Sequence, residues 1–231
     1  MHTPIVLGNI VFEFFLKGGP VMWPILISAI VAVAVVGERA FWWWREGRRR
    51  DPRKLEQLLA ALENSDVAAA KTISEGSEDP VIRMIHHGLS HVGHAHASLL
   101  GALQLAAGIE LKRAGRFLTV MDTLVTLAPL LGLLGTVTGL MRAFLNIGSA
   151  ELSVVGVTGG IGEALIATAC GLAIAIFSLI PFNYFSAKVA QLQFELETAA
   201  TNVEVLVGGG GKTGDTVHLH KPESPGQATS H

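Results

Sequence analysis

Three long apolar stretches dominate the pattern of hydrophobic and polar positions along the chain. They cover about residues 21–44, 121–145 and 157–183, and few charged residues interrupt them. A bilayer core about 30 Å thick requires roughly 20 apolar residues in a helix. Since lipid offers no hydrogen-bond partners, such segments are helical. The pattern therefore predicts an all-α membrane protein with three transmembrane helices.

The polar region between the first two apolar stretches, residues 45–120, also has a helical pattern. Asp51-Pro52 and Asp79-Pro80 are typical of an N-cap followed by proline at the first helical position, and SEGSEDP separates them. Between Pro80 and Pro129 no proline occurs. We therefore expect one long helix that begins in this region and continues into the second crossing. Residues 184–207 extend the third crossing in the same way.

Composition excludes several classes of protein. The chain has 231 residues, of which 50% are hydrophobic and only 16% charged, which argues against a soluble domain. The single cysteine, Cys170, excludes a disulfide framework, and a net charge of −2 excludes a strongly basic nucleic-acid binder. No cofactor site and no metal site is predicted.

The distribution of basic residues predicts the orientation. Eleven of the 17 Lys and Arg residues lie between Arg45 and Arg116, and none lies in the short loop 146–156. The positive-inside rule then places 45–120 and the C-terminus in the cytoplasm, and the N-terminus and the loop outside it. The two extended helices would form a cytoplasmic helical bundle. Residues 1–20 are expected to be an amphipathic segment on the outer surface, and residues 208–231 a disordered tail.

Small residues form a stripe along the second and third crossings. Such stripes let helix backbones approach closely where lipid provides no hydrophobic driving force. They are expected to mediate helix packing within or between subunits. The residues are Gly132, Gly135 and Gly139 on the second crossing, and Gly160, Ala164, Thr168, Gly171, Ala175 and Ser178 on the third.

Three polar residues within the apolar stretches are candidates for function. Glu163 lies about two turns into the third crossing, where a carboxylate is costly. It is interpreted either as a functional group or as a residue hydrated near the outer headgroups. Thr136 and Thr168 lie near mid-membrane, and their hydroxyls either bond their own helix or line a polar path. Asp122 and Arg142 lie close to the ends of the second crossing and are expected to be interfacial.

Two longer strings resemble a known family. PLLGLLGTVTGLMRAF (129–144) and GGIGEALIATACGLAIAIFSLIPFNYF (159–185) resemble the signature of the MotA/TolQ/ExbB proton-channel family. The opening GGPVMWPILISAIVAVAVVGER (18–39) resembles the first crossing of its short, ExbB-type members. The likeness covers all three crossings and is weaker over 45–115.

The resemblance implies a function and a set of partners. It implies a subunit of a bacterial inner-membrane complex, a homopentamer around a one-span, ExbD-like partner whose transmembrane aspartate carries protons. In ExbB-type systems this proton flow energises a TonB-like protein and hence outer-membrane transport. By motif match, Thr136, Thr168 and Glu163 would line the proton path, with Glu163 at its outer end.

Other interpretations stay open from the sequence. A TolQ-like or gliding-motor subunit of the same family, or a non-conducting membrane scaffold, fits the same pattern. An enzyme is not predicted, because no HExxH or GxSxG motif occurs. His87, His91 and His94, within a cluster at 86–96, share one helix face. That face is interpreted as hydrated or as a subunit contact rather than as a metal site.

Overall fold

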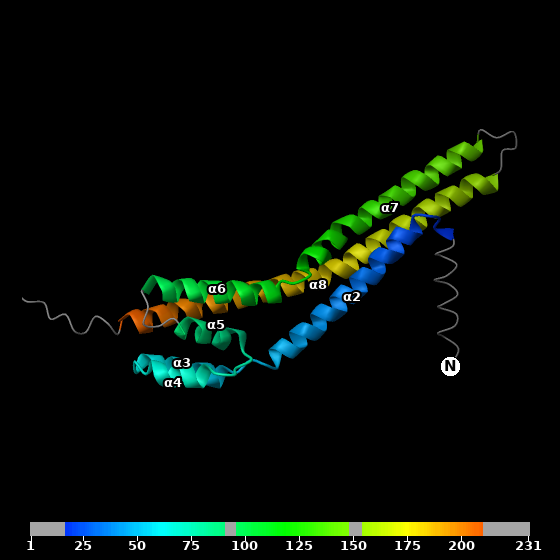
Figure 1. The fold of residues 1–231 in the computed structure, drawn as a ribbon. Coiled ribbons are helices and arrows are strands. Elements are labelled where there is room, and N and C mark those ends of the chain that lie inside the picture. Colours follow the sequence, from blue (N-terminus) through cyan, green and yellow to red (C-terminus); the bar gives the residue numbers. More distant parts are fainter. Residues whose placement is uncertain (1–16, 91–95, 148–153, 210–231) are drawn as a thin grey trace, which may run out of the picture. The chain divides into compact units, whose positions relative to one another are not determined.

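The protein was analysed as a computed structural model, which describes residues 17–90, 96–147 and 154–209. The described residues form helices and contain no strand (Figure 1). The helices are α2 (Met22–Gly47), α3 (Pro52–Glu63), α4 (Val67–Ser74), α5 (Pro80–Leu89), α6 (His96–Ala114), α7 (Leu118–Ile147) and α8 (Val154–Gly209). The predictions for 1–16, for most of the 146–156 loop and for the tail after 209 lie outside the described residues.

Helices α2, α7 and α8 are the membrane helices. Each is long and apolar enough to cross a bilayer, over Met22–Gly47, Leu118–Leu145 and Gly156–Val207. Many of their large apolar side chains are exposed, including Leu130 at 60% and Ile180 at 68%. A soluble domain would bury such residues, whereas a bilayer accommodates them. The predicted all-α membrane fold with three crossings is confirmed.

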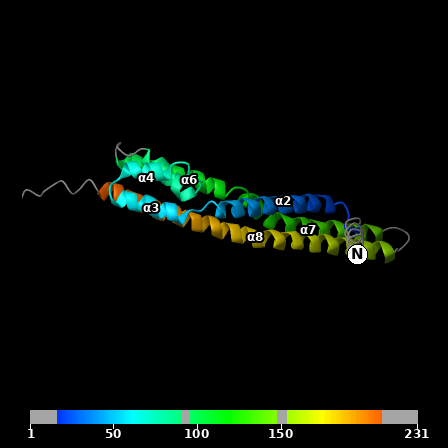
Figure 2. The same ribbon diagram turned by 90° about the horizontal axis from the view of Figure 1, so that it is seen from below.

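The chain divides into two compact units, which are described separately. The described part of the first contains residues 17–50, 107–147 and 154–195, and that of the second contains 51–90, 96–106 and 196–209. In the first unit, α7 and the first part of α8 run side by side (Figures 1 and 2). The start of α2 packs against them through a small core of Val21, Met22, Ile25 and Ala167.

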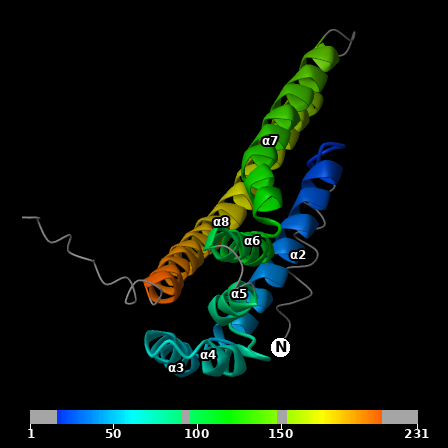
Figure 3. The ribbon, with the colours of Figure 1, turned by 60° about the vertical axis from the view of Figure 1, so that its left-hand side comes forward.

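The second unit contains short helices with side-chain caps. The Asp51 carboxylate accepts a hydrogen bond from the amide of Lys54, and the Asp79 carboxylate accepts one from Val81, so both predicted helix starts are confirmed. Asp79 also accepts the amide of Asp51 at 3.0 Å, which joins the two caps. A further cap, Asp66, begins α4, and α3 and α4 lie side by side (Figure 3).

The third crossing continues as predicted, whereas the second does not. Helix α8 is unbroken for 56 residues through Pro181, about 84 Å at 1.5 Å per residue. The expectation of one long helix leading into the second crossing is wrong, because residues 115–117 separate α6 from α7. Phe117 there has a φ of 64°, a left-handed conformation that an α-helix excludes. Only α8 therefore extends a membrane helix without interruption.

Candidate functional site

The candidate site lies along the seam where α7 and α8 pack together. Gly139 and Gly160 face each other across it. A Cβ atom built on Gly139 would lie 2.7 Å from the carbonyl oxygen of Gly160, and one built on Gly160 would lie 2.8 Å from that of Gly139. A side chain at either position would overlap the backbone of the facing helix. The two backbones are therefore in direct contact at this end of the seam.

The same close packing continues along the seam. A Cβ on Gly132 would lie 3.0 Å from the Cα of Thr168, and one on Gly171 would lie 3.0 Å from the Cα of Gly132. Gly135 faces Ala167, which is fully buried and also contacts the start of α2. Ala164 and Ala175 are buried as well. The structure thus places the small residues of α7 against those of α8, within one chain.

Thr168 connects the two helices by a hydrogen bond. Its hydroxyl lies 3.0 Å from the carbonyl oxygen of Gly132 on α7 and 3.1 Å from that of Ala164 on α8. Its single proton is therefore offered to both helices. A hydroxyl that reaches across to another helix has a role beyond local back-bonding, the usual role of threonine in membrane helices.

Thr136 lies on α7, one turn beyond Gly132. Its hydroxyl donates to the carbonyl of Leu133 on its own helix at 2.6 Å, and the side chain is half-buried. The described residues show no hydrogen bond that joins Thr136, Thr168 and Glu163 to one another. Gly132, whose carbonyl is the partner of the Thr168 hydroxyl, lies one turn from Thr136, so the structure brings both threonines to the same seam. It does not link them directly.

Glu163 forms an ion pair across the seam. The Nη1 atom of Arg142 lies 2.8 Å from its Oε1 atom, and the two side chains are 47% and 15% exposed. The expectation that Arg142 is merely interfacial missed this contact with α8. The available signal in the sequence was that Arg142 and Glu163 lie 21 residues apart, on either side of the short loop.

Comparisons with known proteins cover most of this region. The family profile of the MotA/TolQ/ExbB proton channel family matches residues 76–198. The ExbB-like 3 biopolymer transport protein of Synechocystis sp. is 36% identical over 173 residues, which cover 74% of this chain and 82% of the relative. The ExbB-like 1 protein of the same organism is 34% identical over 210 residues, which cover 89% of this chain and 80% of the relative.

The chain belongs to the MotA/TolQ/ExbB proton channel family. A biopolymer transport protein ExbB of Neisseria gonorrhoeae is also similar, at 38% identity over 89 residues, covering 38% of this chain and 40% of the relative. Among the subfamilies, the chain is most like ExbB. Its membership makes it a transport-associated membrane subunit of the proton-channel type.

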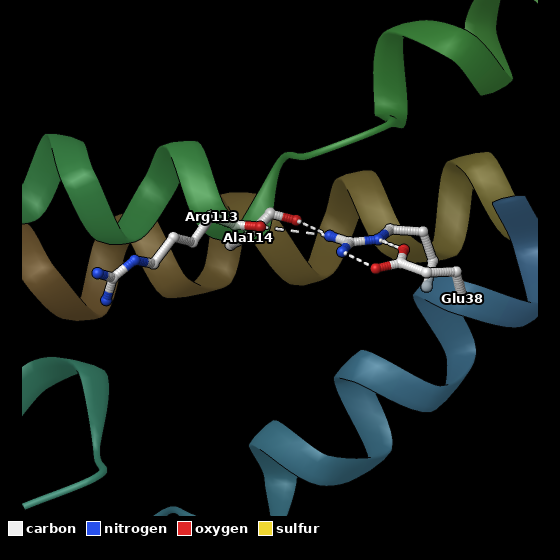
Figure 4. A network of polar contacts seen from close by, with 4 residues as sticks. Glu38, Arg113 and Ala114 are labelled. Carbon is white, nitrogen blue, oxygen red and sulfur yellow. Dashed lines mark hydrogen bonds and ion pairs between the residues drawn. The ribbon is translucent and has the colours of Figure 1, made fainter.

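One buried charge in this MotA/TolQ/ExbB family member, Arg39 on α2, was not predicted from the sequence. Its side chain is 1% exposed. Its Nη1 atom donates to the carbonyls of Arg113 at 3.3 Å and Ala114 at 3.2 Å, the last two residues of α6 (Figure 4). Its Nε and Nη2 atoms donate to the Glu38 carboxylate. The only signal was a Glu-Arg pair within an apolar run.

This guanidinium caps the C-terminal end of α6 at Ala114. The last carbonyls of a helix have no intrahelical donors and carry a partial negative charge. Arg39 supplies both the donors and the positive charge. The rings of Trp42 and Phe117 flank it, with centroids 5.1 and 5.7 Å from the guanidinium carbon. The cap at the end of α6 thus comes from a residue 75 positions earlier in the chain.

We expect Arg39→Met to destabilise this junction locally. Leaving the buried carbonyl of Ala114 without its donor costs about 2 kcal/mol, so amide exchange over residues 111–121 should become roughly 30-fold faster. Hydrogen exchange followed by mass spectrometry measures this. Arg116→Gln is the matched control, because Arg116 is exposed and stacks on the same Phe117 ring at 4.7 Å. Equal effects of the two substitutions would contradict the capping role.

The histidine segment contributes one defined contact. His86 Nδ1 lies 2.8 Å from the Ser74 hydroxyl, which itself donates to the carbonyl of Lys71. In the part of the chain that the structure describes, no three His, Cys, Asp or Glu side chains gather into a metal-binding group. His91 and His94 lie outside that part, so the interpretation of the helix face with His87 stays a prediction.

Proposed function

We propose that the chain is the proton-channel subunit of an ExbB/ExbD-type motor in the bacterial inner membrane. The observation that carries the proposal is the Thr168 hydroxyl, which lies between the backbones of α7 and α8 in a member of this family. Such a hydroxyl can rotate from the Gly132 carbonyl to another acceptor at the cost of one hydrogen bond. It is therefore suited to exchange partners as protons pass.

The proposed path uses three side chains of this chain and one of a partner. Thr136 and Thr168 line it, and Glu163 stands at its outer end. A one-span, ExbD-like partner contributes a transmembrane aspartate that accepts a proton, loses its charge and then moves past apolar surroundings. Each proton contributes about 2.3 kcal/mol per 100 mV of membrane potential. In this proposal the resulting motion energises a TonB-like protein.

An oligomer would cover part of the apolar surface that the membrane helices expose. Val137, Leu140, Met141, Phe144 and Leu145 line a shallow apolar hollow on α7, and the last two are 69% and 72% exposed. In the membrane this surface contacts lipid or other subunits. We propose a homopentamer, the assembly that the family resemblance implies, with the N-terminus periplasmic and the C-terminus cytoplasmic as the positive-inside rule predicts.

Gentle extraction from native membranes tests the proposal. The full chain, tagged after residue 209, is purified with its partners, and their identity and ratio are measured by mass spectrometry. We expect a small one-span protein with a transmembrane aspartate at a ratio of roughly five to two, the ratio that the family resemblance implies for a closed ring around a smaller partner. Co-purification of a Tol-type protein would assign a TolQ-like role. Recovery without any one-span partner would favour the non-conducting scaffold.

A further inference from the structure

The carboxylate of Glu163 is enclosed by three segments of the chain. Arg142 on α7 holds its Oε1 atom at 2.8 Å, and α8 carries the residue itself. The third segment is the turn before α2, where Gly19 has a φ of 70°. A Cβ atom built on Gly19 would overlap the Glu163 carboxylate. The backbone of this turn therefore lies directly against the acid, on a side where no side chain fits.

In the ion pair, the positive charge of the Arg142 side chain compensates the negative charge of Glu163. Among the described residues, Arg142 is the cation bonded to Glu163, and only Oε1 carries a hydrogen bond. Lys17, two residues before Gly19, has a polar contact of its own. Among the described residues, Glu163 belongs to no group of three or more His, Cys, Asp or Glu side chains that could hold a metal ion. The site therefore offers one carboxylate oxygen without a hydrogen bond and little net negative charge.

These features distinguish a proton from an alkali cation. Na⁺ or K⁺ must exchange its hydration shell for several oxygen ligands, and a fixed positive charge beside the path repels it. A proton requires only one oxygen. Once it neutralises Glu163, the charge that holds the guanidinium disappears, and Arg142, which is half-exposed, can turn to water.

We infer that Arg142 is the specificity-determining residue that lets the outer end of the path admit protons and exclude Na⁺. This inference rests on the proposed proton-channel function. In this inference Arg142 acts through Glu163, whose carboxylate takes the proton. It also explains why Gly19 must lack a side chain, because the carboxylate needs the space beside the turn to stay paired with Arg142.

Ion fluxes in liposomes test the inference. The tagged full chain, purified with its native partners, is reconstituted, and proton uptake is followed with a pH-sensitive dye and sodium uptake with ²²Na⁺. We expect Arg142→Gln to raise sodium uptake roughly fivefold, the factor that corresponds to an exposed ion pair of about 1 kcal/mol. Arg142→Lys should retain proton selectivity, and Lys17→Gln should leave both fluxes unchanged.

A double variant separates this role from a structural one. Adding Glu163→Gln to Arg142→Gln should abolish the gain of sodium uptake, because the uncompensated carboxylate that attracts Na⁺ is gone. If Arg142→Gln does not assemble, Arg142→Met, which also removes the charge but keeps an unbranched side chain, serves in its place. Unchanged sodium uptake in assembled Arg142 variants would overturn the inference. Absence of proton uptake by the unmodified complex would instead overturn the proposed function.

Discussion

Gly139→Val is expected to separate α7 from α8. The first side-chain atom at this position would lie 2.7 Å from the carbonyl oxygen of Gly160, 2.9 Å from the Cβ of Ala164 and 3.0 Å from its amide nitrogen. Two of these three atoms belong to the backbone of α8, which cannot turn away as a side chain can. We expect a loss of about 3 kcal/mol or more, at the upper end for overpacked sites. Unfolding in detergent mixed with increasing SDS measures this loss.

Gly162→Ala is the matched control for this prediction. Gly162 lies on the same helix as Gly160, two residues away, and a Cβ atom there would meet nothing within 4 Å. Alanine is the better helix former by up to about 1 kcal/mol, so this variant should be as stable as the unmodified protein or more stable. Similar stabilities of the Gly139→Val and Gly162→Ala variants would show that the close approach in the seam is not maintained in the membrane.

Thr168→Val is expected to reduce proton uptake by the reconstituted complex strongly. Valine has nearly the same shape as threonine but lacks the hydroxyl that lies 3.0 Å from the Gly132 carbonyl. Packing should therefore persist while the proposed proton-exchanging group is lost. We expect proton uptake to fall by at least about tenfold, which corresponds to 1.4 kcal/mol in the barrier. Uptake by liposomes under an imposed membrane potential gives the measurement.

Two variants control for the shape of the side chain and the loss of a hydroxyl. Thr168→Ser keeps the hydroxyl and should retain most of the uptake. Thr138→Val removes a hydroxyl that, among the described residues, bonds only to the carbonyls of Leu134 and Gly135 on its own helix, at 3.0 and 3.1 Å. It should leave uptake near normal. If Thr168→Val conducts like the unmodified complex, the hydroxyl is not on the proton path, and the seam serves packing alone.

Much of the fold could be predicted from the sequence because its determinants are local. An apolar run longer than a bilayer is thick is visible in any window of about 20 residues. The caps Asp51 and Asp79 act on amides two or three positions away, so the short patterns Asp51-Pro52 and Asp79-Pro80 were sufficient. The small residues of α8 recur at helical spacing, so a common face was evident before any partner was known.

The candidate site could be predicted only in part from the sequence. The family strings pointed to Thr136, Thr168 and Glu163, but not to the residues that contact them. The carbonyl of Gly132 lies 36 positions before Thr168, and Arg142 lies 21 positions before Glu163. Such pairs arise from the register of one helix on another, which depends on the fit of entire faces.

By itself, the sequence determined that this chain is helical, that it crosses a membrane three times, and which helix faces carry residues small enough for close packing. Hydropathy, helix caps and helical periodicity depend on residues that are close together in the chain, so each can be recognised from a short segment of sequence. Only the tertiary structure decided how the end of α6 at Ala114 is capped, because the capping guanidinium of Arg39 belongs to another helix. Likewise, the ion pair of Glu163 and the space left by Gly19 exist only where three distant segments meet.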